Sequence, residues 1–127
     1  MMRLCKFWQD RAGSSAAEFA LLVPVFCALT VGAINLCILV YANSLLQFAV
    51  DDAARCQSVK TQICTGATAT EAHAAATFGF TSLAPAFVAS SPACGSKVVG
   101  TATYSLVAVV TTISVPLSAS SCFPVQG

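Results

Sequence analysis

The chain has few charged residues. Charged side chains make up 9% of its 127 residues, against about 25% in typical soluble domains. The formal net charge is only +1, and no stretch interleaves basic with aromatic residues. Proteins that bind nucleic acid need a basic surface to neutralise phosphates. The composition therefore argues against nucleic acid as a partner.

Side chains that carry catalytic chemistry are also scarce. The single histidine, His73, is predicted to be an ordinary surface residue of a short helix, with Glu71 as its only nearby carboxylate. No Gly-x-Ser-x-Gly motif is present, and the many serines and threonines lack a general base to activate them. No Cys-x-x-Cys motif is present either, which disfavours a thiol oxidoreductase and a zinc site. The sequence predicts no enzyme, catalytic residue, cofactor, metal or small-molecule substrate.

A long apolar segment is present instead. No charged residue occurs between Phe19 and Tyr41, and at about 1.5 Å per residue this segment forms a helix about 34 Å long. A hydrocarbon core is about 30 Å thick, so the segment is predicted to span a membrane. Three basic residues precede it: Arg3, Lys6 and Arg11. By the positive-inside rule, they keep the amino terminus in the cytoplasm.

A glycine and a glutamate stand five positions apart immediately before this segment, in Gly13-Ser14-Ser-Ala-Ala-Glu18-Phe19. A carboxylate at the start of a spanning helix is costly unless it meets a positive partner, which makes Glu18 a candidate functional residue. The motif resembles the prepilin motif of the type IV pilin superfamily. With the Asp51-Asp-Ala-Ala-Arg55 segment and the ending Ala119-Ser-Ser-Cys-Phe-Pro124, it resembles more narrowly the TadE-like minor pseudopilins of tight adherence (Tad, or Flp) pili.

The resemblance implies a processing and assembly site. A prepilin peptidase is expected to cut between Gly13 and Ser14, and Glu18 is expected to pair with the new α-ammonium group of a neighbouring subunit. The motif Glu18-Phe19 would then serve processing and assembly. The expected partners are the membrane, the prepilin peptidase, and other pilin and pseudopilin subunits. The expected location is the bacterial inner membrane, as a single-pass protein with a periplasmic head that serves pilus biogenesis and adhesion.

These expectations divide the chain into a basic leader (1–13), a transmembrane helix (14–42) and an exported head (43–127). The alternative is a single-span periplasmic binding or sensor domain on an uncleaved helix. An ordinary secretory signal cut after Ala42 is disfavoured, because its apolar region is usually about 7 to 15 residues long. A lipoprotein is set aside, because Leu36 precedes Cys37 where a small residue is expected.

The head is predicted to begin with an amphipathic continuation of the long helix to about residue 60. Polar and apolar residues recur there on opposite sides at helical spacing. The polar set is Gln47, Asp51, Arg55, Ser58 and Gln62, and the apolar set is Leu45, Leu46, Ala49, Ala53 and Cys56. Asp51 and Arg55 stand at the i,i+4 spacing of an ion pair. The spacing of Thr68 and Glu71 predicts a capping box for a short helix that ends before Gly79.

Beyond this helix, the residues between Val98 and Ala119 are typical of β-strands. Their alternation predicts two antiparallel strands joined between Leu106 and Thr112, with Pro116 at an edge or near a bulge. The predicted fold class is α+β. It is a pilin-like lollipop, in which a long amino-terminal transmembrane helix carries a small disulfide-stapled head of a short helix and an antiparallel strand pair.

Four cysteines fall in the predicted exported part: Cys56, Cys64, Cys94 and Cys122. An even number of cysteines in a small exported domain indicates disulfides, here two. Three pairings are possible. Cys56 and Cys64 flank a short loop, whereas the other two cysteines bracket the strand pair, so the favoured pairing joins Cys56 to Cys64 and Cys94 to Cys122.

Overall fold

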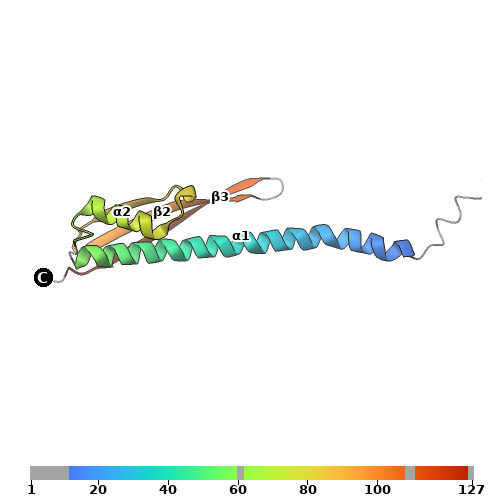
Figure 1. Cartoon of the computed structure of the whole chain (residues 1–127), viewed down its shortest axis with the longest axis horizontal. Helices are drawn as coiled ribbons and strands as arrows, with labels where there is room; N and C mark the ends of the chain where they lie inside the picture. The colour runs from blue at the N-terminus through green and yellow to red at the C-terminus, as the bar shows by residue number, and fades with distance from the viewer. Residues whose placement is uncertain (1–11, 60–61, 108–110, 126–127) are drawn as a thin grey trace, which may run out of the picture. The chain divides into compact units, whose positions relative to one another are not determined.

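The computed structural model describes residues 12–59, 62–107 and 111–125. Its elements are helix α1 (Ala12–Ser58), helix α2 (Ala67–Phe78), the 3-10 turn η2 (Thr81–Leu83), and strands β1 (Ala86–Ser90), β2 (Ser96–Val107) and β3 (Thr112–Phe123) (Figure 1). The predicted α+β class, with a long apolar helix and a disulfide-containing head, is confirmed. The chain divides into two compact units, one ending at Leu36 and the other beginning at Cys37.

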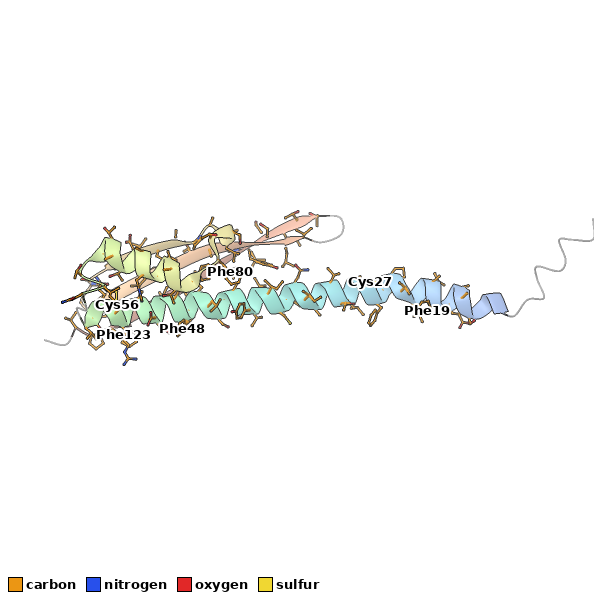
Figure 2. The ribbon with its side chains drawn as sticks, viewed as in Figure 1. Phe19, Cys27, Phe48, Cys56, Phe80 and Phe123 are labelled. Atoms are coloured by element: carbon orange, nitrogen blue, oxygen red, sulfur yellow. A yellow bond between two sulfur atoms is a disulfide. The ribbon has the colours of Figure 1, made fainter. Side chains whose placement is uncertain are left out.

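The first part of α1 exposes all of its described side chains from Ser15 to Ile34, and Figure 2 shows Phe19 and Cys27 projecting from it. Pro24 lies inside the helix, which continues through it. The amide of Asn35 donates to the Val31 carbonyl oxygen at 2.8 Å, so this polar group is satisfied within the helix. Among the described residues, Ser15–Ser58 is the one helix with the length and composition to cross a membrane.

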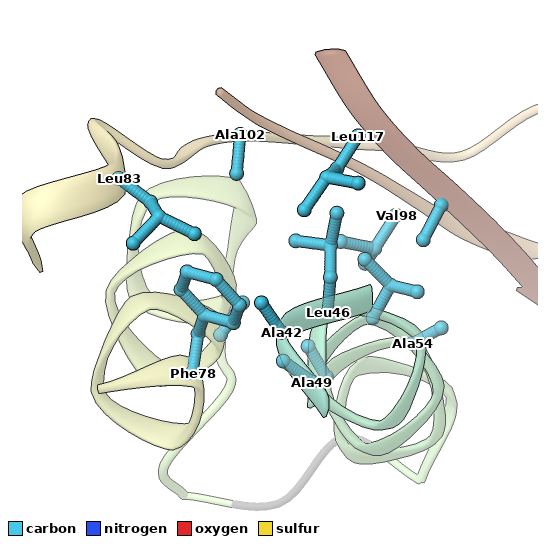
Figure 3. Close-up of a cluster of buried hydrophobic side chains, with 13 residues drawn as sticks. Ala42, Leu46, Ala49, Ala54, Phe78, Leu83, Val98, Ala102 and Leu117 are labelled. Atoms are coloured by element: carbon cyan, nitrogen blue, oxygen red, sulfur yellow. The ribbon is translucent and has the colours of Figure 1, made fainter. Parts of the chain in front are cut away.

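The core of the head lies between the second part of α1, helix α2 and the sheet (Figure 3). Five α1 side chains have no exposed surface: Leu46, Ala49, Val50, Ala53 and Ala54. Three of the five are alanines, and these small side chains let the sheet approach the helix closely. At Gly100 the helix and the sheet are too close for a side chain, since a Cβ there would lie 2.8 Å from Val50 Cγ1. The apolar face predicted for this part of the helix is therefore the face that packs on the sheet.

The substitutions Leu46→Ala and Phe48→Ala test this assignment on two sides of the same turn of α1. Leu46 is fully buried, whereas Phe48 is 59% exposed. Leu46→Ala is expected to lower the free energy of unfolding by about 2 to 5 kcal/mol, and Phe48→Ala by no more than about 0.5 kcal/mol. Thermal unfolding of the full chain in detergent measures both. Equal losses would contradict the assigned face.

The sheet has three antiparallel strands in the order β1-β2-β3. The two predicted strands are confirmed as β2 and β3, which pair from Ser96 with Phe123 to Val107 with Thr112. The prediction of only a strand pair is wrong, because β1 adds a third strand along Lys97–Thr101 of β2. The predicted alternation holds: Val98 and Ala102 are buried, and Thr101 and Thr103 are exposed. The residues 108–110 between the strands lie outside the described part.

Both outer strands carry a feature that limits further strand pairing. Pro116 lies on β3, an edge strand as predicted, and it has no N–H group to donate. On β1, the N–H of Ala89 already donates to Oε1 of Glu71 at 3.0 Å. The Glu71 carboxylate on α2 thus accepts the hydrogen bond of one backbone N–H group on this edge strand.

Helix α2 begins differently from the prediction. Its N-cap is Gly66, without a side-chain cap, so the expected Thr68–Glu71 capping box is wrong. The helix starts one residue before Thr68, and Glu71 bonds β1 instead. Its end agrees with the prediction, because Gly79 takes a left-handed conformation with φ 71°, which glycine adopts at little cost.

The polar side of α1 also differs from the prediction at two positions. Ser58 is only 6% exposed, and its hydroxyl donates to the Arg55 carbonyl oxygen at 2.8 Å. Asp51 accepts a long hydrogen bond of 3.5 Å from the Gln47 amide. In the described part of the chain, this contact replaces the expected ion pair between Asp51 and Arg55.

Candidate assembly and processing site

The predicted cleavage site lies in the first turn of α1, which begins at Ala12. Gly13 and Ser14 both have helical backbone. The leader residues 1–11 and the side chains of residues 12–14 lie outside the described part. Ser14 and Glu18 are four positions apart in one helix, and residues at this spacing share a face with Cβ atoms about 5 to 6 Å apart. The structure therefore places the predicted cleavage point and the carboxylate on the same side of α1.

Glu18 and Phe19 are both exposed, and 69% of the surface of Phe19 is accessible to solvent. Within the described residues, no hydrogen bond or ion pair reaches the Glu18 carboxylate. A carboxylate beside an apolar spanning segment is stabilised by an opposite charge within about 4 to 6 Å. The described part of the chain does not supply that charge.

The two disulfides of the head join Cys56 to Cys64 and Cys94 to Cys122, which is the pairing favoured from the sequence. Their Cα atoms are 5.8 Å and 6.4 Å apart, within the usual range for disulfides. The first ties the end of α1 to the loop before α2, and the second ties the β1–β2 turn to the end of β3. The free cysteines Cys27 and Cys37 lie exposed on α1.

One contact near the first disulfide was missed by the sequence analysis. His73 is half-buried, and its Nε2 lies 2.7 Å from Oδ2 of Asp52. The sequence indicates only Glu71 as a nearby carboxylate, whereas the carboxylate that contacts His73 in the structure is that of Asp52. The two residues are 21 positions apart and meet only because α2 packs on α1. No local sequence pattern could have revealed this pair.

The same region brings three potential metal ligands together. One ring nitrogen of His73 and the sulfurs of Cys56 and Cys64 all lie within 4.8 Å of one another. Thiolate is the form of cysteine that binds metals, and here the two sulfurs are bonded to each other. In this disulfide state the cluster does not offer two thiolate ligands.

An exposed apolar helix that continues into a small disulfide-linked α+β head is the architecture of a pilin-like, membrane-anchored protein. Comparison with known proteins finds a matching family for the first part of the chain: residues 13–55 match the family described as TadE-like protein. This match confirms, over these residues, the resemblance to the TadE-like family predicted from the sequence.

The head shows a second similarity. Residues 48–110 match the family described as Bacteriophage Mu Gp45, N-terminal, which overlaps the first match at residues 48–55. No curated protein and no solved structure matches the chain. The TadE-like match is the finding that bears on the candidate site, because it includes Gly13, Ser14, Glu18 and Phe19.

Proposed function

We propose that this chain is a structural minor pseudopilin of a tight adherence pilus, cut by a prepilin peptidase between Gly13 and Ser14. The observation that carries the proposal is the TadE-like match, which begins at Gly13 and includes Glu18. In this role the protein is a substrate of processing and a building block needed for pilus biogenesis and adhesion. It has no catalytic chemistry of its own.

The proposal divides the chain into a leader (1–13), a transmembrane helix (14–42) and a head (43–127). Ala42, the last residue of the proposed transmembrane helix, is 1% exposed and belongs to the core of the head, so α1 enters the head near this boundary. The head would lie in the periplasm and the amino terminus in the cytoplasm, with the helix anchored in the bacterial inner membrane. The basic residues of the leader favour this orientation.

Glu18 is the proposed docking residue. Cleavage would create an α-ammonium group on Ser14, which sits four positions before Glu18 on the same helical face. The equivalent ammonium group of a neighbouring pilin or pseudopilin subunit would pair with the exposed carboxylate. Two opposite charges about 4 Å apart interact by about 4 kcal/mol at an effective dielectric of about 20. This attraction would set the axial position of one helix relative to the neighbouring helix.

Three substitutions at Glu18 test the charge separately from the size of the side chain. Glu18→Ala and Glu18→Gln both remove the charge and are expected to reduce incorporation into the pilus assembly at least about tenfold, equivalent to about 1.4 kcal/mol. Glu18→Asp keeps the charge on a shorter side chain and is expected to retain an intermediate level. The measurement is co-purification with other pilus subunits from membranes, normalised to the amount of mature protein.

Membrane insertion and leader removal should stay largely intact in all three variants. A neutral residue in the alanine and glutamine variants enters the membrane more easily than a carboxylate, and the aspartate variant keeps the wild-type charge. Normal co-purification of the alanine and glutamine variants would remove the docking role. If the glutamine variant assembles like the wild type and the alanine variant does not, assembly depends on the size and polarity of the side chain and not on its charge.

A further inference from the structure

The first disulfide, Cys56–Cys64, lies beside the contact between Asp52 and His73. Asp52 and Cys56 are one turn apart on α1, Cys64 lies in the loop before α2, and His73 lies on α2. A ring nitrogen of His73 is within 4.8 Å of both sulfurs, and its Nε2 is 2.7 Å from Oδ2 of Asp52. The only imidazole of the chain is thus held by a carboxylate next to one of the two disulfides.

The disulfide is open to a reactant from one side. It borders a surface hollow of about 450 Å³ lined by Asp52, Arg55, Cys56, Val59, Ile63 and His73. Cys56 is partly exposed, whereas Cys64 is 2% exposed. An incoming thiolate therefore meets Cys56 first, which leaves the buried Cys64 sulfur as the leaving group. Asp52, Arg55 and His73 are the titratable side chains that line the hollow in the described part of the chain.

We propose that Cys56–Cys64 is the exchangeable disulfide of the head, opened and closed by thiol–disulfide exchange with a protein dithiol, with His73 as the proton donor and acceptor for Cys64. In opening, the partner's thiolate attacks Cys56 Sγ and forms a mixed disulfide. The bond between Cys56 and Cys64 breaks, its electron pair passes to Cys64 Sγ, and the His73 imidazolium protonates that sulfur. Asp52 is a positioning residue that orients the imidazole ring.

Closing is the reverse reaction. The Cys56 thiolate first attacks the partner's disulfide, whose S–S bond breaks, so that a mixed disulfide forms and the other partner sulfur leaves as a thiolate. Neutral His73 then takes the proton from the Cys64 thiol. The Cys64 thiolate attacks Cys56 Sγ and releases the partner as a dithiol. Two thiols of the head are oxidised and one disulfide of the partner is reduced.

The placement of His73 on α2 links this reaction to folding. His73 reaches the sulfurs only when α2 is packed against α1, so it assists closure of the native pair after the helices have docked. A pairing of Cys56 with Cys94 or Cys122 receives no such assistance. The site therefore favours the native pairing kinetically during export of the head.

The test compares the two disulfides of one molecule in the full chain in detergent. Free thiols are first blocked by alkylation, and glutathione is then added at a series of pH values between 5 and 8, where imidazoles titrate. Opened cysteines are trapped with a second, mass-distinguishable reagent and assigned by peptide mapping. Each rate is divided by the concentration of glutathione thiolate. The pH dependence that remains then arises from groups of the protein and not from the ionisation of glutathione.

The normalised opening rate of Cys56–Cys64 is expected to fall as the pH rises, because the proposed proton donor is the protonated form of the imidazole. His73→Gln should lower this rate by about three- to tenfold at pH 6, because the leaving thiolate loses its proton donor, and should flatten its pH profile. Asp52→Asn should give an intermediate rate. The rate at Cys94–Cys122 should be the same in all variants.

Glu71→Gln is the matched control for loosened packing, because Glu71 ties α2 to β1 without lining the hollow. It should leave the pH profile of Cys56–Cys64 unchanged. Identical profiles in the wild type and His73→Gln would overturn the proposal. The same change in Glu71→Gln as in His73→Gln would also overturn it, since packing alone would then account for the rate.

Discussion

Gly13→Val is expected to leave the chain at its full length, inserted in the membrane but unprocessed. We expect the peptidase to require a residue without a side chain before the cut, because a bulky group there would crowd an active site at the membrane face. Wild-type protein should begin at Ser14, and the variant at Met1. Without the cut no α-ammonium forms on Ser14, so the variant should also fail to assemble. Amino-terminal sequencing and intact mass of protein from membranes measure this.

Gly32→Val is the matched control, since it places the same side chain on the same helix. A Cβ at Gly32 meets nothing within 4 Å, and the variant should be cut after Gly13 like the wild type. A wild-type chain that begins at Met1 would favour a single-span binding or sensor domain on an uncleaved helix. A chain that begins at Asn43 would point to an ordinary secretory signal. Either result would contradict the pseudopilin proposal.

Gly95→Ala is expected to cause the largest loss of stability among single substitutions in the head. Gly95 has φ 120°, and a Cβ there would lie 2.2 Å from the Phe123 carbonyl oxygen and 2.8 Å from Pro124 Cα. These are backbone atoms, so no side-chain rotation relieves the contact. Backbone strain of about 1 to 3 kcal/mol adds to overpacking of about 1 to 3 kcal/mol, for a total of about 2 to 6 kcal/mol. Thermal unfolding in detergent provides the measurement.

Gly79→Ala separates the two contributions to this loss. Gly79 also has a positive φ, 71°, but a Cβ there meets nothing within 4 Å. Its substitution should cost only about 1 kcal/mol, the price of a left-handed conformation for a residue with a Cβ. If Gly79→Ala were as destabilising as Gly95→Ala, the close approach of Phe123 would not be the cause.

Much of the fold follows from local patterns in the sequence. The long helix is predicted because no charged residue interrupts the apolar segment from Phe19 to Tyr41 and because an amphipathic pattern follows it. In the structure, α1 extends from Ala12 to Ser58. The alternation in β2 and β3 is local as well, and it identified the residues that face the helices. Gly79 stops α2 because of its own conformational freedom.

The missed features all depend on contacts between distant segments. Strand β1 has only five residues, Ala86–Ser90, and becomes a strand by pairing with β2. Glu71 has the right spacing for a cap, but the N–H of Ala89 competes for the same carboxylate. The pair of Asp52 and His73 requires the packing of α2 on α1. Glu18 was a candidate from its position before the apolar segment, but the cleavage point between Gly13 and Ser14 could be proposed only through family resemblance, because the residues that would recognise it belong to another molecule.

The two edge strands of the sheet, β1 and β3, affect how readily the heads aggregate by pairing strand to strand. After Glu71 the chain contains a single charged residue, Lys97, so charge repulsion gives neighbouring heads little protection from aggregation. Pro116 on β3 and the Glu71 carboxylate on β1 hinder the addition of a foreign strand. For a chain that assembles as proposed, these two features oppose edge-to-edge pairing of the heads before assembly.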